Sequence, residues 1–241
     1  MKLARMPDGS PEIFHTVQGE GRHAGRPSVF IRSSHCNLSC RWCDTPYTWN
    51  WQGTSHDHDE AVKYDQEEQI IEMSVKEIAD HVGQYPCHHF VFTGGEPLLH
   101  EKEWIALMEL LSGTYEVETN GTILPGDSFL ERVGQINVSP KLSNSGVDSA
   151  KRIRPSVLEG FAAIEQADFK FVVATQDDFA EVESLIDQFD LPRNRVFLMP
   201  QASTPDELDH AGSFVPELAE ANGLQFSDRL HLRLFGATRG T

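Results

Sequence analysis

The chain has 241 residues, of which 39% are hydrophobic and 24% are charged, a composition typical of one globular domain. Its formal net charge of −17 argues against direct binding to nucleic acid, because that binding depends on basic patches. No apolar run approaches the ~20 residues that span a bilayer, and residues 1–14 lack the apolar segment of a secretory signal. We therefore expect a cytoplasmic protein that acts on a small molecule or a protein partner, without a membrane partner.

Short runs of β-branched and aromatic residues recur along the chain, and stretches of helical periodicity separate most of them. The runs predict strands at 28–33, 89–93, 115–119, 135–139, 169–174, 195–199 and 229–235. The stretches between them predict helices at 74–82, 101–111, 177–189 and 204–222. Ser74 and Glu77 form a capping-box pattern at the start of the first helix, and Pro216 can divide the last helix into two.

The alternation of strands and helices favours parallel βαβ units with right-handed crossovers. A complete TIM barrel needs ~250 residues, so this length favours about six units in an open sheet or a partial, incomplete TIM-type barrel. We expect residues 1–241 to form a single α/β domain with an inserted polar loop at about 47–72. Ligand sites of such folds lie at the carboxyl ends of the strands, so the residues that follow each strand are the functional candidates.

Three of the four cysteines lie close together, at Cys36, Cys40 and Cys43. In a reducing compartment such a group favours a metal or catalytic site over disulfides. Three thiolates can hold three irons of a [4Fe–4S] cluster, which usually takes four, and leave one iron open for a substrate or cofactor. The alternative is zinc, which would need a fourth ligand such as His35 or Cys87. A lone cysteine such as Cys87 is otherwise expected to be a packing residue.

The predicted insertion is polar, acidic and aromatic, and it contains the sequence HDHDE. His56 and His58 in this sequence could bind a metal ion. A solvated loop is the commoner fate of such a composition. We therefore predict a solvated loop and keep a metal site at these two histidines as the alternative.

The spacing CxxxCxxC after the first predicted barrel strand, with Trp42 directly before the last cysteine, resembles the radical S-adenosylmethionine (SAM) enzymes. The segment FTGGEP at 92–97 resembles the glycine-rich segment of the same superfamily. The resemblance implies a radical SAM core in which the three cysteines bind a [4Fe–4S] cluster and SAM binds the open iron. One electron would then split the sulfonium, and the deoxyadenosyl radical would take a hydrogen atom from the substrate.

A narrower resemblance rests on HTVQGEGRHAGRPSVFIR at 15–32, CDTPYTW at 43–49 and NVSPK at 137–141. These segments resemble the 7-carboxy-7-deazaguanine synthase family. Its members are lyases that convert 6-carboxy-5,6,7,8-tetrahydropterin to 7-carboxy-7-deazaguanine with loss of ammonia, on the route to 7-deazapurines such as queuosine. The resemblance also implies a Mg²⁺ ion, a flavodoxin-like electron donor and a homodimer.

The family resemblance assigns roles to individual residues of this chain. Thr45 would bind Mg²⁺, which prefers oxygen ligands. The residues that would hold SAM are Trp42, Gly95, Glu96, Ser139, Pro140 and Lys141. The residues that would hold the substrate are Val17, Gln18, Gly19, Arg32, Thr93 and Thr241.

Physical chemistry supports several of these roles. Gly95 has no Cβ to obstruct SAM, and Glu96 can accept hydrogen bonds from the SAM ammonium group. Arg32 offers a bidentate fork to a carboxylated substrate, and Gln18 can donate to and accept from a flat heterocycle. Taken singly, each has a structural alternative, such as a tight turn at the glycines, a surface salt bridge at Arg32 or a surface lysine at Lys141.

Two other functions remain open at this stage. A glycyl-radical activating enzyme would share the cysteine loop and the glycine segment, but it would not be expected to carry the segment at 15–32 with Arg32. A zinc-stabilised binding module would need a fourth ligand beside the three cysteines. Iron content separates the second alternative from the radical enzymes, and ammonia release from the carboxylated pterin separates the first.

Overall fold

The computed structural model describes residues 1–211 and 213–241. Its strands are β1 (Lys2–Ala4), β2 (Ile13–Val17), β3 (Pro27–Ser33), β4 (Ile70–Glu72), β5 (His89–Gly94), β6 (Thr114–Thr119), β7 (Gln135–Val138), β8 (Ala167–Val173), β9 (Val196–Pro200) and β10 (Gln225–Phe226). In the described residues they form one sheet in the order β10-β9-β8-β7-β6-β5-β3-β1-β4, with β2 paired to β3.

Parallel pairing runs without interruption from β3 through β5, β6, β7, β8 and β9 to β10. The strands β1, β2 and β4 are antiparallel additions at the β3 side. Because β10 and β4 stand at opposite ends of the order, the sheet does not close. The predicted partial barrel is confirmed, and the first six predicted strands correspond to β3 and β5 to β9.

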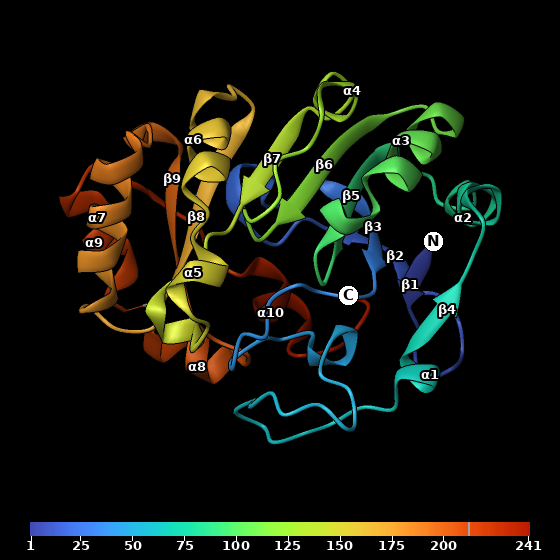
Figure 1. The fold of residues 1–241 in the computed structure, drawn as a ribbon, viewed down its shortest axis with the longest axis horizontal. Coiled ribbons are helices and arrows are strands. Elements are labelled where there is room, and N and C mark those ends of the chain that lie inside the picture. Colours follow the sequence, from blue (N-terminus) through green and yellow to red (C-terminus); the bar gives the residue numbers. More distant parts are fainter. Residues whose placement is uncertain (212) are drawn as a thin grey trace.

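Several helices pack against the outer side of the curved sheet, as Figure 1 shows for α3, α6 and α7, whereas α8 and α10 pack on each other in a separate small cluster. Their bounds are α1 (Gln66–Gln69), α2 (Val75–Val82), α3 (Glu101–Leu110), α4 (Asp127–Leu130), α5 (Ser149–Arg152), α6 (Pro155–Ala163), α7 (Asp178–Phe189), α8 (Pro205–Ala211), α9 (Val215–Ala221) and α10 (Leu230–Phe235). None of the described helices is long and apolar enough to cross a membrane.

Strand β8 illustrates why the two sides of the sheet differ. Phe169, Phe171 and Val173 are fully buried in the main hydrophobic core, which the outer helices share. Lys170 and Val172 alternate with them and line a cavity on the inner side. Since successive side chains of a strand point to opposite faces, the outer face of the sheet forms the core and the inner face is free to carry polar groups.

The predicted helix boundaries are largely confirmed. The capping box of α2 is present, because Ser74 Oγ accepts from Glu77 N at 3.2 Å and Ser74 N donates to Glu77 Oε2 at 2.7 Å. The predicted helix at 204–222 consists of two helices, α8 and α9, with Pro216 in the first turn of the second. Proline fits a first turn because its missing N–H would have no partner there.

The strand predicted at 229–235 is wrong, because this segment forms α10. The last parallel strand is β10, which pairs with β9 just upstream. The alternation of leucine with polar residues suggested a strand. Of the three leucines, however, only Leu232 is buried, and Leu234 is 54% exposed. Leucine and arginine are good helix formers, so the segment adopts a short helix once Arg229 is anchored in the cavity at its start.

The predicted insertion contains α1 and β4 near its end, and β4 joins the sheet beside β1. The irregular part is held by Lys63, whose Nζ donates to Asn50 Oδ1 and to the carbonyl of His56, both at 2.6 Å. His58 Nε2 lies 2.8 Å from the carbonyl oxygen of Cys43. This contact packs the segment beside the cysteine loop. Within the described residues, no group of three potential metal ligands includes His56 or His58.

Candidate active site

The three clustered cysteines follow the carboxyl end of β3, and all of them are free thiols. They line one cavity of about 230 Å³ on the inner side of the sheet. Burial raises the pKa of Cys36 and of Cys43, and it raises the pKa of Cys40 to about 12. Cys87 lies at the amino-terminal end of the strands, where its Sγ is 3.3 Å from the carbonyl of Pro27, the first residue of β3. It is therefore remote from the three cysteines and cannot complete a site with them.

The glycine-rich segment at the end of β5 packs directly against the cysteine loop. A Cβ on Gly95 would lie 2.1 Å from the carbonyl oxygen of His35, and a Cβ on Gly94 would lie 2.2 Å from that of Ser33. The backbone N–H of Glu96 donates to the same His35 carbonyl at 2.8 Å. The glycines are thus required by the close approach of two backbones, and Gly95 also lines the cavity.

Glu96 is fully buried and is not among the described residues that line the cavity. Its Oε1 accepts from Leu98 N at 2.9 Å and from Thr119 Oγ1 at 2.8 Å, and its Oε2 accepts from Asn120 N at 2.7 Å. Burial raises its pKa. In this structure Glu96 joins the end of β5 to the end of β6 through protein donors, whereas the sequence suggested a contact with SAM.

The cysteine loop offers a setting that fits a three-thiolate cluster. Cys36 Sγ accepts from Leu38 N at 3.4 Å and from Asn120 Nδ2 at 3.8 Å. Hydrogen bonds to sulfur of this kind adjust the potential of iron–sulfur clusters. Among the described residues that line the cavity, the only cysteines are these three, so the donor set leaves the fourth corner of a cubane without a thiolate.

Four of the six predicted SAM-binding residues line the cavity, and Glu96 and Pro140 do not. Lys141 Nζ donates to Ser139 Oγ at 2.9 Å and lies 5.6 Å from the centre of the Trp42 ring. These three residues line the cavity, and Pro140 does not. The segment after β7 therefore presents an ammonium and a hydroxyl to the cavity, a pairing suited to a carboxylate or a ribose.

The predicted substrate-binding residues also meet in the cavity, which is lined by Val17, Gln18, Gly19, Arg32, Thr93 and Thr241. Arg32 Nε donates to Glu12 Oε1 at 2.6 Å, and Tyr47 donates to the same oxygen at 3.0 Å. Arg239 Nε donates to the other oxygen at 2.8 Å, and its guanidinium stacks on the Tyr47 ring. No hydrogen bond among the described residues uses the terminal nitrogens of Arg32, which remain available to a ligand.

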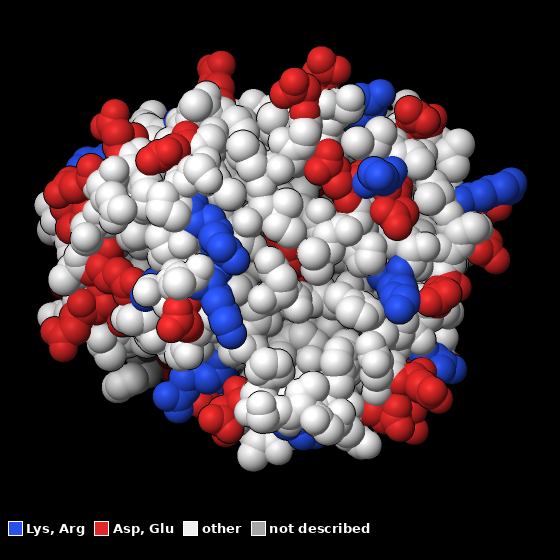
Figure 2. All heavy atoms as spheres, in the orientation of Figure 1, with Lys and Arg blue, Asp and Glu red and all other residues white. Residues whose placement is uncertain are grey.

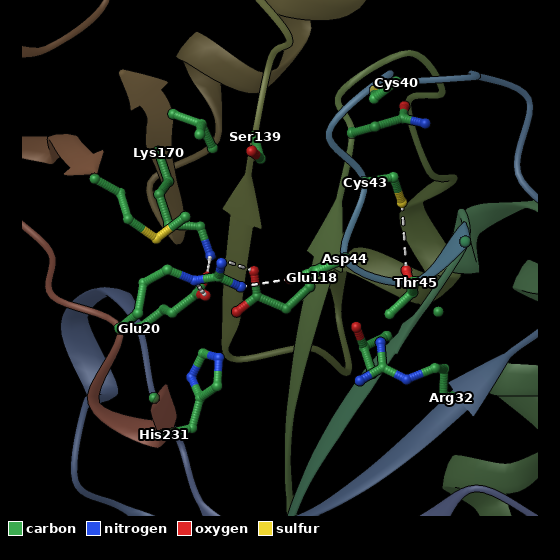
Figure 3. Close-up of a pocket in the computed structure, with 18 of the residues that line it drawn as sticks. Glu20, Arg32, Cys40, Cys43, Asp44, Thr45, Glu118, Ser139, Lys170 and His231 are labelled. Atoms are coloured by element: carbon green, nitrogen blue, oxygen red, sulfur yellow. Dashed lines mark hydrogen bonds and ion pairs between the residues drawn. The ribbon is translucent and has the colours of Figure 1, made fainter. Parts of the chain in front are cut away.

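Thr45 lines the cavity next to the cluster loop. Its Oγ1 lies 3.6 Å from Cys43 Sγ. In the view of Figure 3, Thr45 lies between Cys43 and Arg32. Its hydroxyl therefore lies between Cys43 and Arg32, where it could serve as an oxygen ligand for a small cation.

A second group of charged residues lines the cavity and was not identified from the sequence. Lys170 on β8 lies 2.5 Å from Glu20 Oε2 and 2.8 Å from Glu118 Oε2 (Figure 3). Burial raises the pKa of Glu118 even beside this lysine. Burial would also raise the pKa of Glu20, but the charges of Lys170 and Arg229 hold it well below its usual range.

Arg229 completes this charged group from the C-terminal segment. Its Nε donates to Glu20 Oε1 at 2.9 Å, and its terminal nitrogens donate to Asp44 Oδ2 and to the carbonyl of Ala202. His231, the second residue of α10, also lines the cavity. The group thus ties the segment after β2, the cysteine loop and the C-terminal helix around one cavity. On the face drawn in Figure 2, acidic side chains lie mainly around the rim and the centre is mostly uncharged.

One signal in the sequence could have revealed this group. Lys170 is a single charge inside the apolar run FKFVV, and Glu116 and Glu118 alternate in the same way in YEVET. A charge at the centre of a buried strand needs a partner, so these positions indicate a polar inner face. Glu20 and Arg229 carry no comparable local signal.

The chain matches the Radical SAM superfamily model over residues 30–162. It is 36% identical to the 7-carboxy-7-deazaguanine synthase of Pyrobaculum aerophilum, with 95% of each chain covered. It is 33% identical to that of Rhodopirellula baltica, with 95% of this chain and 87% of the relative covered. The crystal structure of QueE from Escherichia coli superimposes with a TM-score of 0.65 and 25% identity over 96% of this chain and 95% of that one. The chain therefore belongs to the radical SAM superfamily and, within it, to the 7-carboxy-7-deazaguanine synthase family.

Proposed function

We propose that this enzyme converts 6-carboxy-5,6,7,8-tetrahydropterin to 7-carboxy-7-deazaguanine with loss of ammonia. The observation that carries the proposal is the single cavity that holds three free cysteines at one side and Arg32 with a buried charged group at the other. An activating enzyme would need access for a protein substrate, whereas this cavity is lined by charged side chains that complement a small carboxylated heterocycle. A zinc module would need a fourth ligand beside the cysteines. Cys87 is remote, and among the described residues no group of three potential metal ligands includes His35 or the three cysteines.

Cys36, Cys40 and Cys43 are the residues that would hold the [4Fe–4S] cluster that membership of the superfamily implies. The residues placed to hold SAM are Trp42, Gly95, Ser139 and Lys141, all of which line the cavity. When bound, the cluster and SAM supply a deoxyadenosyl radical that removes a hydrogen atom from the substrate. Glu96 and Pro140 do not line the cavity, and we propose that they support the neighbouring residues that do.

The substrate half of the cavity would recognise a carboxylated pterin by complementary charge. The free terminal nitrogens of Arg32 offer a fork to the carboxylate, and a bidentate pair of this kind fixes orientation as well as affinity. The contact of Arg32 Nε with the Glu12 carboxylate orients this fork. Thr93 and Gln18 line the same cavity, and we propose that they contact the pterin ring.

The pterin edge carries an amino group and a ring N–H, and both are hydrogen-bond donors. Glu20 and Glu118 are carboxylate acceptors at the cavity wall, and Lys170 neutralises part of their charge. We propose that these carboxylates receive the donor edge of the ring. The enclosed cavity would also keep water away from a substrate radical.

Thr45 is the residue that would contribute an oxygen to Mg²⁺. Magnesium retains most of its water and is commonly held by one or two protein oxygens together with substrate oxygens. A Mg²⁺ ion beside Thr45 would lie near Arg32, so both could contact the substrate carboxylate. The flavodoxin-like electron donor and the homodimer are proposed on the family resemblance alone, and the cytoplasmic location stays a prediction from the sequence.

The proposal is tested by an ammonia assay on anaerobically reconstituted protein with 6-carboxytetrahydropterin, SAM, Mg²⁺ and a chemical reductant. The expected result is release of ammonia together with 7-carboxy-7-deazaguanine. Cys40→Ala should abolish cluster binding and turnover. The matched variant Cys87→Ala should retain both, because Cys87 lies at the amino-terminal end of the strands, away from the cysteine loop. Cleavage of SAM without any ammonia release from the pterin by the parent enzyme would contradict the proposed substrate.

A further inference from the structure

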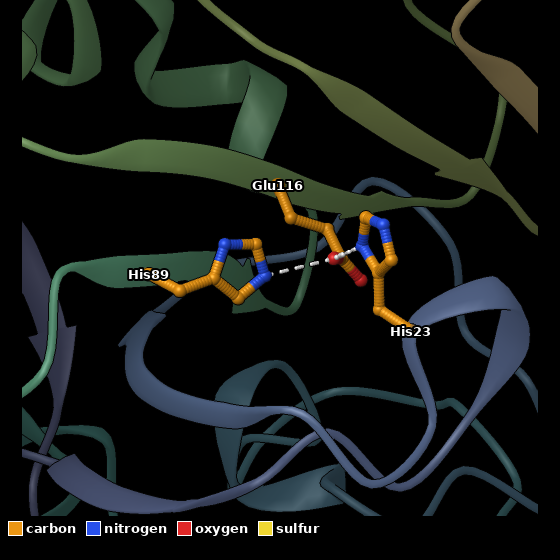
Figure 4. Close-up of side chains that lie close together, drawn as sticks. All are labelled: His23, His89 and Glu116. Atoms are coloured by element: carbon orange, nitrogen blue, oxygen red, sulfur yellow. Dashed lines mark hydrogen bonds and ion pairs between the residues drawn. The ribbon is translucent and has the colours of Figure 1, made fainter.

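A second group of metal-ligating side chains lies at the opposite end of the strands from the cysteine loop. His23, His89 and Glu116 each direct one ligand atom to a common point, and these atoms lie within 4.8 Å of one another (Figure 4). His23 ends the short 3-10 turn η1 (Gly21–His23), and His89 is the first residue of β5. None of the three is among the described residues that line the cavity.

Both imidazoles converge on the same oxygen of Glu116. His23 Nδ1 is 2.6 Å and His89 Nε2 is 3.1 Å from Glu116 Oε2. The other oxygen, Oε1, already accepts from the amide groups of Gln18 at 2.5 Å and Asn137 at 2.6 Å. The carboxylate is therefore oriented from behind by two donors, with its second oxygen presented only to the histidines.

The outer contacts of His89 also leave one ring nitrogen for this common point. Its Nδ1 lies 2.8 Å from Thr114 Oγ1, which leaves Nε2 directed at Glu116. A metal-binding histidine usually bonds its other ring nitrogen to a neighbouring oxygen in this manner. The Glu116 and His89 sides of the group thus already have the supporting contacts that a metal site needs.

We propose that His23, His89 and Glu116 form a binding site for a divalent transition-metal ion, with Zn²⁺ as the ion that this donor set favours. Two imidazoles and one carboxylate form a recognised zinc ligand set, and they leave a fourth position for water. Ligand atoms around tetrahedral zinc are separated by about 3.3 Å, as bond lengths of about 2.0–2.1 Å require. The observed separations from Glu116 are 2.6 and 3.1 Å, and the two ring nitrogens lie within 4.8 Å of each other, so a shift of the rings would bring the three atoms to this spacing.

His23 is the group that can make this movement and admit the ion. Its side chain is 27% exposed, whereas those of His89 and Glu116 are 5% and 0% exposed. An ion would enter from the His23 side, displace the ring protons that face Glu116 and keep a water molecule as its fourth ligand. Rotation of one half-exposed ring disturbs little of the surrounding packing.

The position of the site indicates what the bound ion does. Gln18 lines the cavity, and its amide is held by Glu116 Oε1. His23 follows the same segment five positions later in the sequence. The ion fastens this segment to β5 and β6 beneath the cavity, so its role is to stabilise the wall that carries Gln18 and Glu20.

Equilibrium dialysis of the cluster-loaded enzyme against Zn²⁺ in excess Mg²⁺, followed by elemental analysis of zinc and iron, tests the site. The expected result for the parent is one zinc per chain with the iron content unchanged. His23→Gln should lower zinc affinity by at least the ~10–100-fold that loss of a supporting contact costs. Glutamine can still donate to Glu116, so this variant is expected to fold.

Two matched variants and one second measurement complete the test. His88→Gln changes the exposed neighbour of His89, and His58→Gln changes a histidine of the insertion; both should retain the zinc. Thermal melting should show that zinc raises the melting temperature of the parent and of His88→Gln, and leaves His23→Gln unchanged. Substoichiometric zinc in the parent, or zinc that survives His23→Gln and is lost in His58→Gln, would overturn the proposal, since the group would then be a hydrogen-bonded cluster only.

Discussion

Lys170 Nζ lies 2.5 Å from the carboxylate of Glu20, which stands 150 positions earlier in the chain. The contact joins a buried charge at the centre of β8 to the segment that follows β2. Glu118 contacts the same ammonium from β6. One lysine therefore contacts two carboxylates at the wall of the cavity, and Arg229 provides a second positive charge to Glu20.

We predict that Lys170→Met lowers the free energy of unfolding by about 3–5 kcal/mol at pH 7, because removing one partner leaves buried charges without compensation. Without the lysine, the pKa of Glu118, which burial already raises, rises further in the folded state, and the pKa of Glu20 loses one of the two positive charges that lower it. The deficit should therefore be largest at neutral pH and shrink as the pH falls and the Glu118 carboxyl takes up a proton. Urea denaturation of the cluster-free chain across pH 5–8 measures it.

A second substitution checks that charge causes this loss. Lys170→Met combined with Glu118→Gln removes one of the uncompensated carboxylates, so it should recover part of the lost stability at pH 7. A deficit that is the same at pH 5 and pH 8, and that the second substitution leaves unchanged, would point to lost packing of the lysine stem.

Arg32→Ala is predicted to raise KM for the carboxylated pterin by roughly 10–100-fold, which corresponds to loss of a hydrogen-bonded charge contact. Cleavage of SAM in the absence of substrate should persist, since the arginine lies away from the proposed SAM half of the cavity. Arg132→Ala, which changes an exposed arginine bonded to Ser128, is the matched control. Parallel loss of SAM cleavage and pterin turnover would refute the substrate role.

Gly95→Ala is predicted to destabilise the cysteine loop, because the added Cβ would lie 2.1 Å from the carbonyl of His35. Overpacking of this kind costs about 1–3 kcal/mol, and here it should also reduce the iron that reconstitution loads. Gly134→Ala is the matched control, since its Cβ would meet nothing closer than 3.8 Å. Iron content and melting temperature are the measurements, and full iron loading by Gly95→Ala would show that the loop tolerates the methyl group.

Glu96→Gln separates a structural role from a role in SAM binding. Only one oxygen would remain to serve Leu98, Thr119 and Asn120, so at least one buried donor would lose its acceptor at a cost of about 1–3 kcal/mol. We predict a lower melting temperature as the main effect. A large rise in the KM for SAM with unchanged stability would instead support the contact with the SAM ammonium that the motif suggested.

Local patterns predicted the features that depend on local chemistry. The six strands β3 and β5 to β9 were predictable because their apolar runs are buried on the outer face, and the residues after them converge because parallel strands end at one edge. The cysteine loop was predictable from its spacing. Within α10, by contrast, alternating leucines imitated a strand, and long-range anchoring of Arg229 to Glu20 and Asp44 decided the outcome.

Within the charged group of the cavity, only Lys170 and Glu118 carried a local signal in the sequence, and their partners were not predictable because they come from distant segments. Glu20, Lys170 and Arg229 meet only when the sheet curves and the C-terminal segment folds across it. Glu96 shows the converse limit: the sequence motif placed it correctly after β5, but its side chain turns into the interior between β5 and β6. A motif locates the backbone, and packing decides where the side chain points.

The central claim is that the three cysteines leave one iron of the cluster for SAM. The electron paramagnetic resonance spectrum of reduced, reconstituted protein, recorded before and after addition of SAM, tests it most directly. We predict about four irons per chain and a cluster signal whose g values shift when SAM is added. A signal that SAM leaves unchanged, or folded protein that binds zinc at the cysteine loop in place of iron, would contradict the account.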